Sequence, residues 1–228
     1  MRKIPIALFL AFATACAPSA AAPAATATPT ATVPSTAAPP SIPSASAGAT
    51  WTVTSASKAT VSVREQLVGV SLPSDAVLTA TGAAGSFAVN ADGTFTPESK
   101  ITFDVSTLAS DRRDRDNFIK QSTLQVRQFP AATFVPTKAT GLTLPLAADA
   151  DVTFALAGKL TIHGVTKDVT FDVVAKRSGA QLTATATAAP ALRFEDFGMT
   201  APSVPFRVVS VTDEIHLVVE VVATGAAS

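Results

Sequence analysis

The sequence predicts an all-β domain of about eight short antiparallel strands with one short helical insertion, arranged as a barrel or a sandwich. Apolar and polar side chains alternate at a period of two along many short segments, as they do in strands that bury one face. No long amphipathic helix separates these segments, which argues against a parallel sheet. Charged residues make up only 15% of the chain, a composition typical of exported β proteins.

The alternating segments begin at Trp51 and continue to the C-terminal end of the chain. The first clear hairpin places Phe87 and Phe95 on either side of a turn at 90–93, where Gly93 supplies a positive φ. The last strand carries apolar residues at alternate positions from Ile215 through Leu217 and Val219 to Val221. The other apolar sets expected to share one interior face are Val61 and Val63; Ile101, Phe103 and Val105; Val152, Phe154 and Leu156; Leu160 and Ile162; Val169, Phe171 and Val173; and Leu182, Ala184 and Ala186.

One charge-rich segment interrupts the strands and is expected to form a short helix at about 111–124. Its apolar residues recur near helical spacing, and Ser110 or Asp111 would cap its N-terminus. The arginines at 112, 113 and 115 are expected to be solvated there. Contact of these arginines with lipid head groups or an anionic membrane surface is the alternative.

Three aspartates of this segment, Asp111, Asp114 and Asp116, resemble a calcium-binding loop only superficially. The neighbouring arginines cancel their charge, and glycine and glutamate do not follow at the spacing of such a loop. We therefore expect a solvated helix start and no metal site.

The first 15 residues are expected to be a secretory signal peptide, with a short basic start and an apolar run too short to span a bilayer permanently. The small residues of 13–15 precede Cys16 as they do in the bacterial lipobox, in which the cysteine is acylated and becomes the first residue of the mature protein. Acylation would anchor the protein stably to a membrane. Ordinary cleavage near Ala15, with Cys16 incidental, is the alternative.

Residues 16–49 consist almost entirely of alanine, proline, threonine and serine, without charge or apolar periodicity. Such a segment cannot bury enough apolar surface to offset its ordering entropy, so we expect a disordered, extended tether. The folded domain is then expected over 50–223, followed by a short tail at 224–228.

Charge and cysteine content exclude several classes of function. Basic and acidic residues are equal at 17 each, so no general positive field would attract nucleic acid. Cys16 is the single cysteine, so the chain can form no internal disulfide and no thiolate metal cluster. The sequence also lacks the G-x-S-x-G nucleophile elbow, the P-loop and the Rossmann glycine pattern.

Two histidines are the remaining candidates for chemistry. His163 lies in a predicted tight turn just before Gly164, where turn geometry explains it better than a catalytic or metal-binding role. His216 lies on the face of the last strand opposite Ile215 and Leu217, so it should point outward into solvent.

Three stretches of the folded region, taken in order, resemble one known family. They are 101–134 (ITFDVSTLASDRRDRDNFIKQSTLQVRQFPAATF), 158–173 (GKLTIHGVTKDVTFDV) and the weaker 194–198 (FEDFG) with its downstream Asp213. Together they resemble the YceI-like polyisoprenoid-binding domain over about Trp51 to Ala223. The resemblance implies an eight-stranded, lipocalin-like barrel around an elongated hydrophobic channel that holds a polyisoprenoid or a similar long-chain lipid.

The phenylalanines are the natural candidates for a channel lining, because the chain has 13 of them, one tryptophan and no tyrosine. Ordinary core packing accounts for most of them. A subset on the apolar face of the strands or on the helix is expected to line the channel: Phe87, Phe103, Phe118, Phe154 and Phe171.

The sequence therefore predicts non-enzymatic binding, storage or transport of an isoprenoid lipid, with an isoprenoid quinone as one candidate and no cofactor beyond the bound lipid. The protein would be exported and anchored through Cys16, on the outer face of the cytoplasmic membrane or in the periplasm. One alternative is a structural or partner-binding envelope protein with a filled barrel. Another is an enzyme that acts on a lipid through His163. Both a monomer and a homodimer remain open.

Overall fold

The computed structural model describes residues 48–203 and 207–225. The predicted signal at 1–15, Cys16 and nearly all of the predicted tether lie outside these residues. Strands dominate the described part, and their bounds are β1 (Trp51–Val53), β2 (Lys58–Leu67), β3 (Ser74–Ala80), β4 (Ala84–Phe87), β5 (Lys100–Asp104), β6 (Ala131–Thr140), β7 (Asp151–Ile162), β8 (Val165–Ser178), β9 (Gln181–Ala188) and β10 (Val208–Gly225). The helical elements are η1 (Val105–Thr107), α1 (Arg113–Phe118), η2 (Ile119–Thr123) and η3 (Glu195–Phe197).

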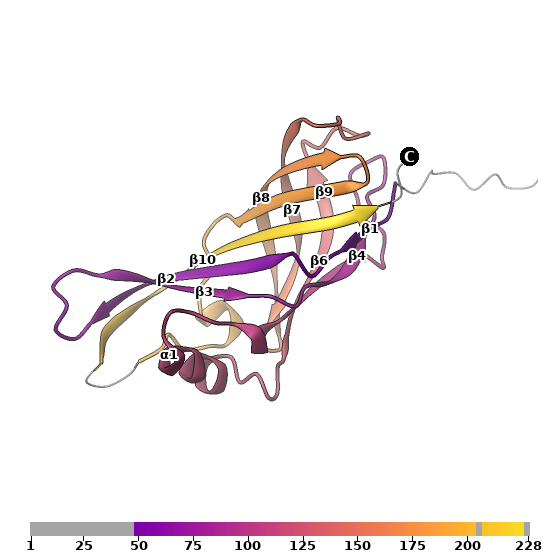
Figure 1. Ribbon diagram of the computed structural model, residues 1–228. Helices are drawn as coiled ribbons and strands as arrows, with labels where there is room; N and C mark the ends of the chain where they lie inside the picture. Colours follow the sequence, from indigo (N-terminus) through magenta and orange to yellow (C-terminus); the bar gives the residue numbers. More distant parts are fainter. Residues whose placement is uncertain (1–47, 204–206, 226–228) are drawn as a thin grey trace, which may run out of the picture. The chain divides into compact units, whose positions relative to one another are not determined.

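The sheet closes into a ring in the order β1-β4-β5-β6-β7-β8-β9-β10, and β10 returns to pair with β1 (Figure 1). These eight strands are joined by antiparallel pairs, which confirms the predicted eight-stranded antiparallel barrel and excludes the sandwich. Closure leaves the ring without a free edge, so backbone groups on both sides of its strands can pair.

Two further strands extend the barrel at one end. β2 continues the path of β1 and pairs with β10 between Val208 and Glu220, and β3 pairs with β2. At the break between β1 and β2, the Thr54 N–H donates to the Val222 carbonyl at 2.8 Å, and the Val222 N–H donates to Ser57 Oγ at 2.8 Å. These bonds join the chain to β10 across the break, and β10 spans both the ring and its extension.

Alternation along the strands places the apolar side chains inside, as predicted. On β8, Phe171 and Val173 are buried, whereas Asp172 between them is exposed. His216 is exposed on β10 between the buried Ile215 and Leu217, as the pattern predicted.

Two tight turns follow their predicted chemistry. The Gly93 N–H donates to the Asn90 carbonyl at 2.9 Å, and Gly93 has a φ of 81°. His163 and Gly164 join β7 to β8 with φ values of 51° and 75°, which are typical of the two-residue turn that matches strand twist. The structure thus supports the interpretation of His163 as a turn residue.

The helical insertion occurs where it was predicted, but its N-terminus differs. α1 begins at Arg113, and Arg112 rather than Ser110 or Asp111 occupies the capping position. Ser110 instead accepts a hydrogen bond from the Arg112 N–H at 3.1 Å. Asp116 is buried and accepts hydrogen bonds from both the backbone N–H and the hydroxyl of Ser110, so the expected solvated helix start was wrong for this aspartate.

The barrel interior is filled at the end where β1 meets the end of β10. Trp51 is buried there against Gly225, where a side chain on the glycine would approach Trp51 to 2.8 Å. Val53 on β1, Leu182 on β9 and Ala223 on β10 continue this packing. The opposite end of the barrel, toward β2, β3 and the helical insertion, is different and contains the site.

Candidate functional site

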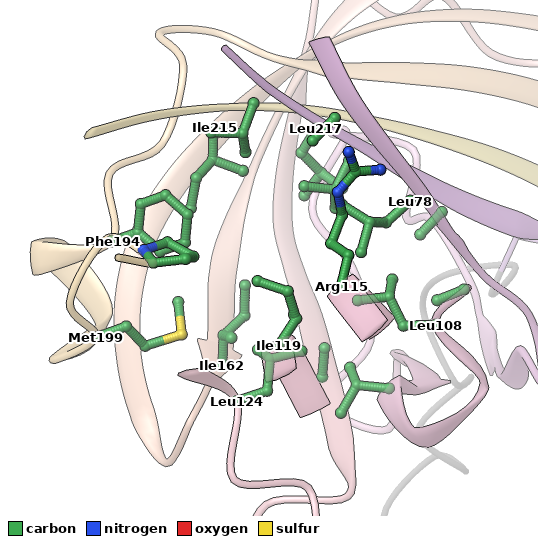
Figure 2. Close-up of a pocket in the computed structure, with 18 of the residues that line it drawn as sticks. Leu78, Leu108, Arg115, Ile119, Leu124, Ile162, Phe194, Met199, Ile215 and Leu217 are labelled. Carbon is green, nitrogen blue, oxygen red and sulfur yellow. The ribbon is translucent and has the colours of Figure 1, made fainter. Parts of the chain in front are cut away.

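A cavity of about 1040 Å³ occupies the end of the barrel that faces the helical insertion (Figure 2). Its walls come from β2, β3 and β5 to β10, which point alternate side chains inward. Its volume lies at the upper end of the range usual for small-molecule sites. The barrel is therefore neither solid nor hollow throughout: one end is packed and the other is open.

Apolar side chains in cross-strand register form one wall of the cavity. Leu217 on β10 lies opposite Val61 on β2, and Val61 lies opposite Leu78 on β3. Ile215 lies opposite Val63 in the same way. Because strand pairing fixes the register, these side chains form a continuous wall that is held by the sheet and not by loops.

The helical insertion and one loop cover the cavity from another side. Ile119 and Leu124 of the insertion face Ile162 at the end of β7, and Phe194 and Met199 point into the same space (Figure 2). All five of these side chains are apolar, so the surface that they form suits an apolar ligand.

Asp213 holds the loop that carries Phe194 and Met199. Its carboxylate accepts a hydrogen bond from the Phe194 N–H at 2.8 Å and pairs with the Arg193 guanidinium at 3.1 Å. The hydrogen bond to Asp213 raises the pKa of Arg193 above its ordinary value, and the negative charge of Glu195 raises it further. The 194–198 stretch and Asp213, which the sequence singled out together, are therefore joined in space.

A charged pair lies within the otherwise apolar lining. The Arg115 guanidinium reaches into the cavity from α1, and its Nη2 lies 2.5 Å from Glu65 Oε1 on β2 (Figure 2). The side chains of Arg115 and Glu65 are only 15% and 7% exposed. Arg115 also pairs with the exposed Asp111 at 2.6 Å. This pair connects the helical insertion to the barrel wall.

Sequence reasoning missed this pair, although the signal for one partner was present. Glu65 follows Val61 and Val63 at the same period of two, so alternation places a carboxylate on the inward face of β2. An inward charge in a strand requires a partner. Arg115 could not be identified as that partner, because 50 residues separate the two.

Exposed charged residues surround the mouth of the cavity. Arg112, Arg113, Asp114 and Arg207 contribute to its lining. Arg207 pairs with Asp114 at 3.1 Å, and both side chains are largely exposed. An exposed ion pair of this kind contributes little to stability and can exchange partners readily.

Three of the five phenylalanines predicted to line the channel do line the cavity, namely Phe103, Phe118 and Phe171. Phe87 and Phe154 belong to the packed end instead. Phe87 lies opposite Trp51 and contacts the Phe95 ring at 6.5 Å between centroids, and Phe154 lies opposite Val173. Contact of any of the five with a ligand stays a prediction.

His163 lies outside the cavity lining, against the outer loop that contains η3. Its Nδ1 lies 3.4 Å from the Phe197 carbonyl oxygen, and its ring meets Phe129 edge-on at 4.7 Å. Within residues 48–203 and 207–225, no three histidines, cysteines or carboxylates lie together as a metal site would need. No helix in these ranges is long and apolar enough to cross a membrane.

Known structures share this fold at low sequence identity. A polyisoprenoid binding domain from Saccharophagus degradans, implicated in plant cell wall breakdown, matches with a TM-score of 0.57 and 11% identity, over 77% of this chain and 98% of that domain. BcnA of Burkholderia cenocepacia matches with a TM-score of 0.55 and 19% identity, over 75% of this chain and 99% of BcnA. The YceI protein of Campylobacter jejuni matches with a TM-score of 0.52 and 16% identity, over 71% and 93%.

Sequence comparison leads to the same group of proteins. A UPF0312 protein of Pseudomonas putida strain W619 is 39% identical over 130 residues, which span 49% of this chain and 61% of that protein. The chain thus covers less than two thirds of this curated relative. The model of the YceI-like domain matches residues 51–223, which is nearly all of the described barrel. The chain therefore belongs to the YceI-like family, as the three sequence stretches predicted.

Proposed function

We propose that this protein binds a polyisoprenoid or a similar long-chain lipid inside its barrel, and that it stores or carries this lipid in the cell envelope without catalysis. The observation that carries the proposal is the apolar cavity of about 1040 Å³ at one end of the barrel. Family membership supports the same class of ligand, since the neighbour from Saccharophagus degradans is described as a polyisoprenoid binding domain.

Burial of apolar surface can provide the affinity. At about 25 cal/mol per Å², several hundred Å² of isoprenoid chain gives a favourable free energy on the order of 10 kcal/mol before ordering costs. The lining requires few polar contacts for this purpose. Isoprenoid quinones fall within the ligand class, and the partly buried Arg115 guanidinium in the lining is a donor for a carbonyl head group.

We place the protein outside the cytoplasm on its N-terminal sequence. The secretory features of 1–15 and the position of Cys16 support export followed by acylation, and the 16–49 composition supports an extended tether. An anchored carrier would keep its cavity close to the membrane that supplies the lipid.

Lipid extraction and mass spectrometry test the proposal directly. Full-length protein purified from its native host should release an isoprenoid or other long-chain lipid in a fixed ratio to protein. The variant Leu217→Trp fills the cavity and should lose most of this lipid, whereas Val174→Trp, on the exposed face of β8, should retain it. Repeated recovery of no lipid from the wild-type protein would refute the proposal.

A further inference from the structure

The structure exposes a cluster of apolar side chains beside the mouth of the cavity. We call it the apolar tip: Val68, Val70 and Leu72 in the turn between β2 and β3, and Val209 at the start of β10. They are 52%, 46%, 74% and 65% exposed, and they are four of the six large apolar side chains exposed in the described part of the chain. Exposed apolar clusters of this kind mark protein or membrane contacts.

The tip is one surface because β10 begins beside the β2–β3 turn. Val208 pairs with Leu67, and the Val68 N–H donates to the Arg207 carbonyl at 3.0 Å. Figure 1 shows the β2–β3 hairpin and the start of β10 extending together beyond the barrel. Val68 and Val70 also line the cavity, so the tip and the proposed lipid site share apolar side chains.

The turn is held together by its own hydrogen bonds. Gln66 Nε2 donates to the carbonyls of Leu67 and Val70, and the Val70 N–H donates to the Leu67 carbonyl at 3.3 Å. These bonds satisfy backbone groups that would otherwise lose water when the tip enters an apolar medium.

Charges around the tip fit an interface between apolar and anionic layers. Residues 66–73 contain no charge. Behind them lie the exposed arginines 64, 112, 113 and 207, opposed by the exposed Asp75, Asp111 and Asp114. The partly buried Arg115 and the buried Glu65 and Asp116 belong to the same group, so five arginines balance five carboxylates. The ion pairs among them are exposed and weak, so the guanidinium groups can turn to lipid phosphates at little cost.

A second copy of the chain fits this surface less well. A stable protein interface buries at least about 1,200 Å² in total, and two facing turns with four apolar side chains each would bury far less. Apolar side chains backed by arginines instead match the layering of a bilayer surface, where the acyl boundary lies beneath the phosphates.

From these contacts we infer that the apolar tip inserts into the head-group and acyl boundary of a lipid membrane, with the neighbouring arginines at the phosphates. The mouth of the cavity then opens onto the bilayer, and a lipid can pass between the two along apolar surface. Passage of lipid rests on the proposed function, whereas insertion of the tip does not.

A position-specific fluorescent probe tests the insertion. In full-length protein carrying Cys16→Ser, a single cysteine is introduced as Ser71→Cys at the tip or as Ala180→Cys in the β8–β9 turn at the packed end, and labelled with an environment-sensitive dye. With vesicles of phosphatidylethanolamine and phosphatidylglycerol, the Ser71→Cys label should brighten and shift to the blue, and the Ala180→Cys label should not. An equal response at both sites, or none at Ser71→Cys, would overturn the inference.

Two exposed valines provide a matched pair of variants. In the Ser71→Cys background, Val209→Asp at the tip should weaken vesicle binding at least about tenfold, while Val174→Asp on β8 should leave it unchanged. The protein should also bind vesicles of phosphatidylcholine alone, with an affinity reduced by less than about tenfold relative to the anionic vesicles. The reduction should be small because the net charge beside the tip is small.

Oligomeric state and lipid content separate the remaining outcomes. A wild-type dimer that Val209→Asp converts to a monomer, without any vesicle response, would assign the tip to contact between copies and overturn the inference. Protein that retains extracted lipid but never inserts would refute the inference alone. Protein that inserts but never contains lipid would refute the proposed function alone.

Discussion

Removal of the Arg115 side-chain charge should destabilise the domain by about 3 kcal/mol, because it leaves the Glu65 carboxylate without its partner inside the barrel. Breaking one side of a buried pair costs about 3–5 kcal/mol. The low end of that range applies here, since Arg115 is 15% exposed and water can partly solvate what remains. The contact of Arg115 with Asp111 adds little, because the Asp111 side chain is 74% exposed.

The variant Arg115→Met tests this loss of unfolding free energy in a urea titration that is monitored by circular dichroism. With a slope of about 2 kcal/mol per molar urea, a loss of 3 kcal/mol lowers the midpoint by about 1.5 M. The double variant Glu65→Leu with Arg115→Met removes both charges and should recover stability to within about 1 kcal/mol of the wild type.

Arg64→Met is the matched control for this experiment. Arg64 precedes Glu65 on β2, and its pair with Asp75 at 3.1 Å is exposed on both sides. Its loss should cost less than about 1 kcal/mol. The reasoning fails if Arg115→Met is no less stable than Arg64→Met, or if the double variant is less stable than Arg115→Met.

Three further predictions concern other parts of the chain. Gly93→Ala should cost about 1–3 kcal/mol in the same urea titration, because φ is 81° and an added Cβ would lie 2.6 Å from the Ala139 carbonyl oxygen. Hydrogen bonds from Thr94 lower the pKa of Asp92 from 3.8, so its contribution to stability is present above pH 3.8 and is lost as pH falls through the lowered value. Asp92→Asn should remove that part of the pH dependence, and an unchanged acid titration would contradict this. Cys16→Ser should abolish labelling by radioactive palmitate in the native host, and equal labelling of the two proteins would exclude acylation at Cys16.

The strands were predictable because side-chain alternation can be read from each short segment and indicates which face of the strand is buried. The sequence of β8 indicates by itself that Phe171 and Val173 face inward and that Asp172 faces out. The turn at His163 and Gly164 was equally local, since two residues with positive φ suffice to reverse the chain. Family resemblance then resolved the choice between barrel and sandwich.

Alternation does not give the height of a residue along the barrel. Phe154 and Phe171 have the same inward phase on adjacent strands, yet only Phe171 lines the cavity. The difference depends on where each strand crosses the ring and on which end Trp51 fills, and both are set by pairing between distant strands. The predicted helix cap was wrong because Ser110 binds the buried Asp116 carboxylate and Arg112 occupies the capping position, an arrangement that helical spacing alone does not indicate.

The two ends of the barrel differ in their interiors: one is packed with side chains, and the other contains the cavity. Around Trp51 and Ala223 the strands pack on one another, so the fold does not depend on a ligand there. Toward the cavity, inward side chains such as Leu78 and Leu217 are also buried, but they line an open space. Polar contacts add to the strand pairing there: Glu65 with Arg115 on one side and Asp213 with the Phe194 loop on the other. A ligand that fills the cavity would add the missing apolar contacts, so bound lipid should raise stability with its concentration. The two polar contacts join the helical insertion and the Phe194 loop to the barrel on the sides of the cavity, where that ligand would lie.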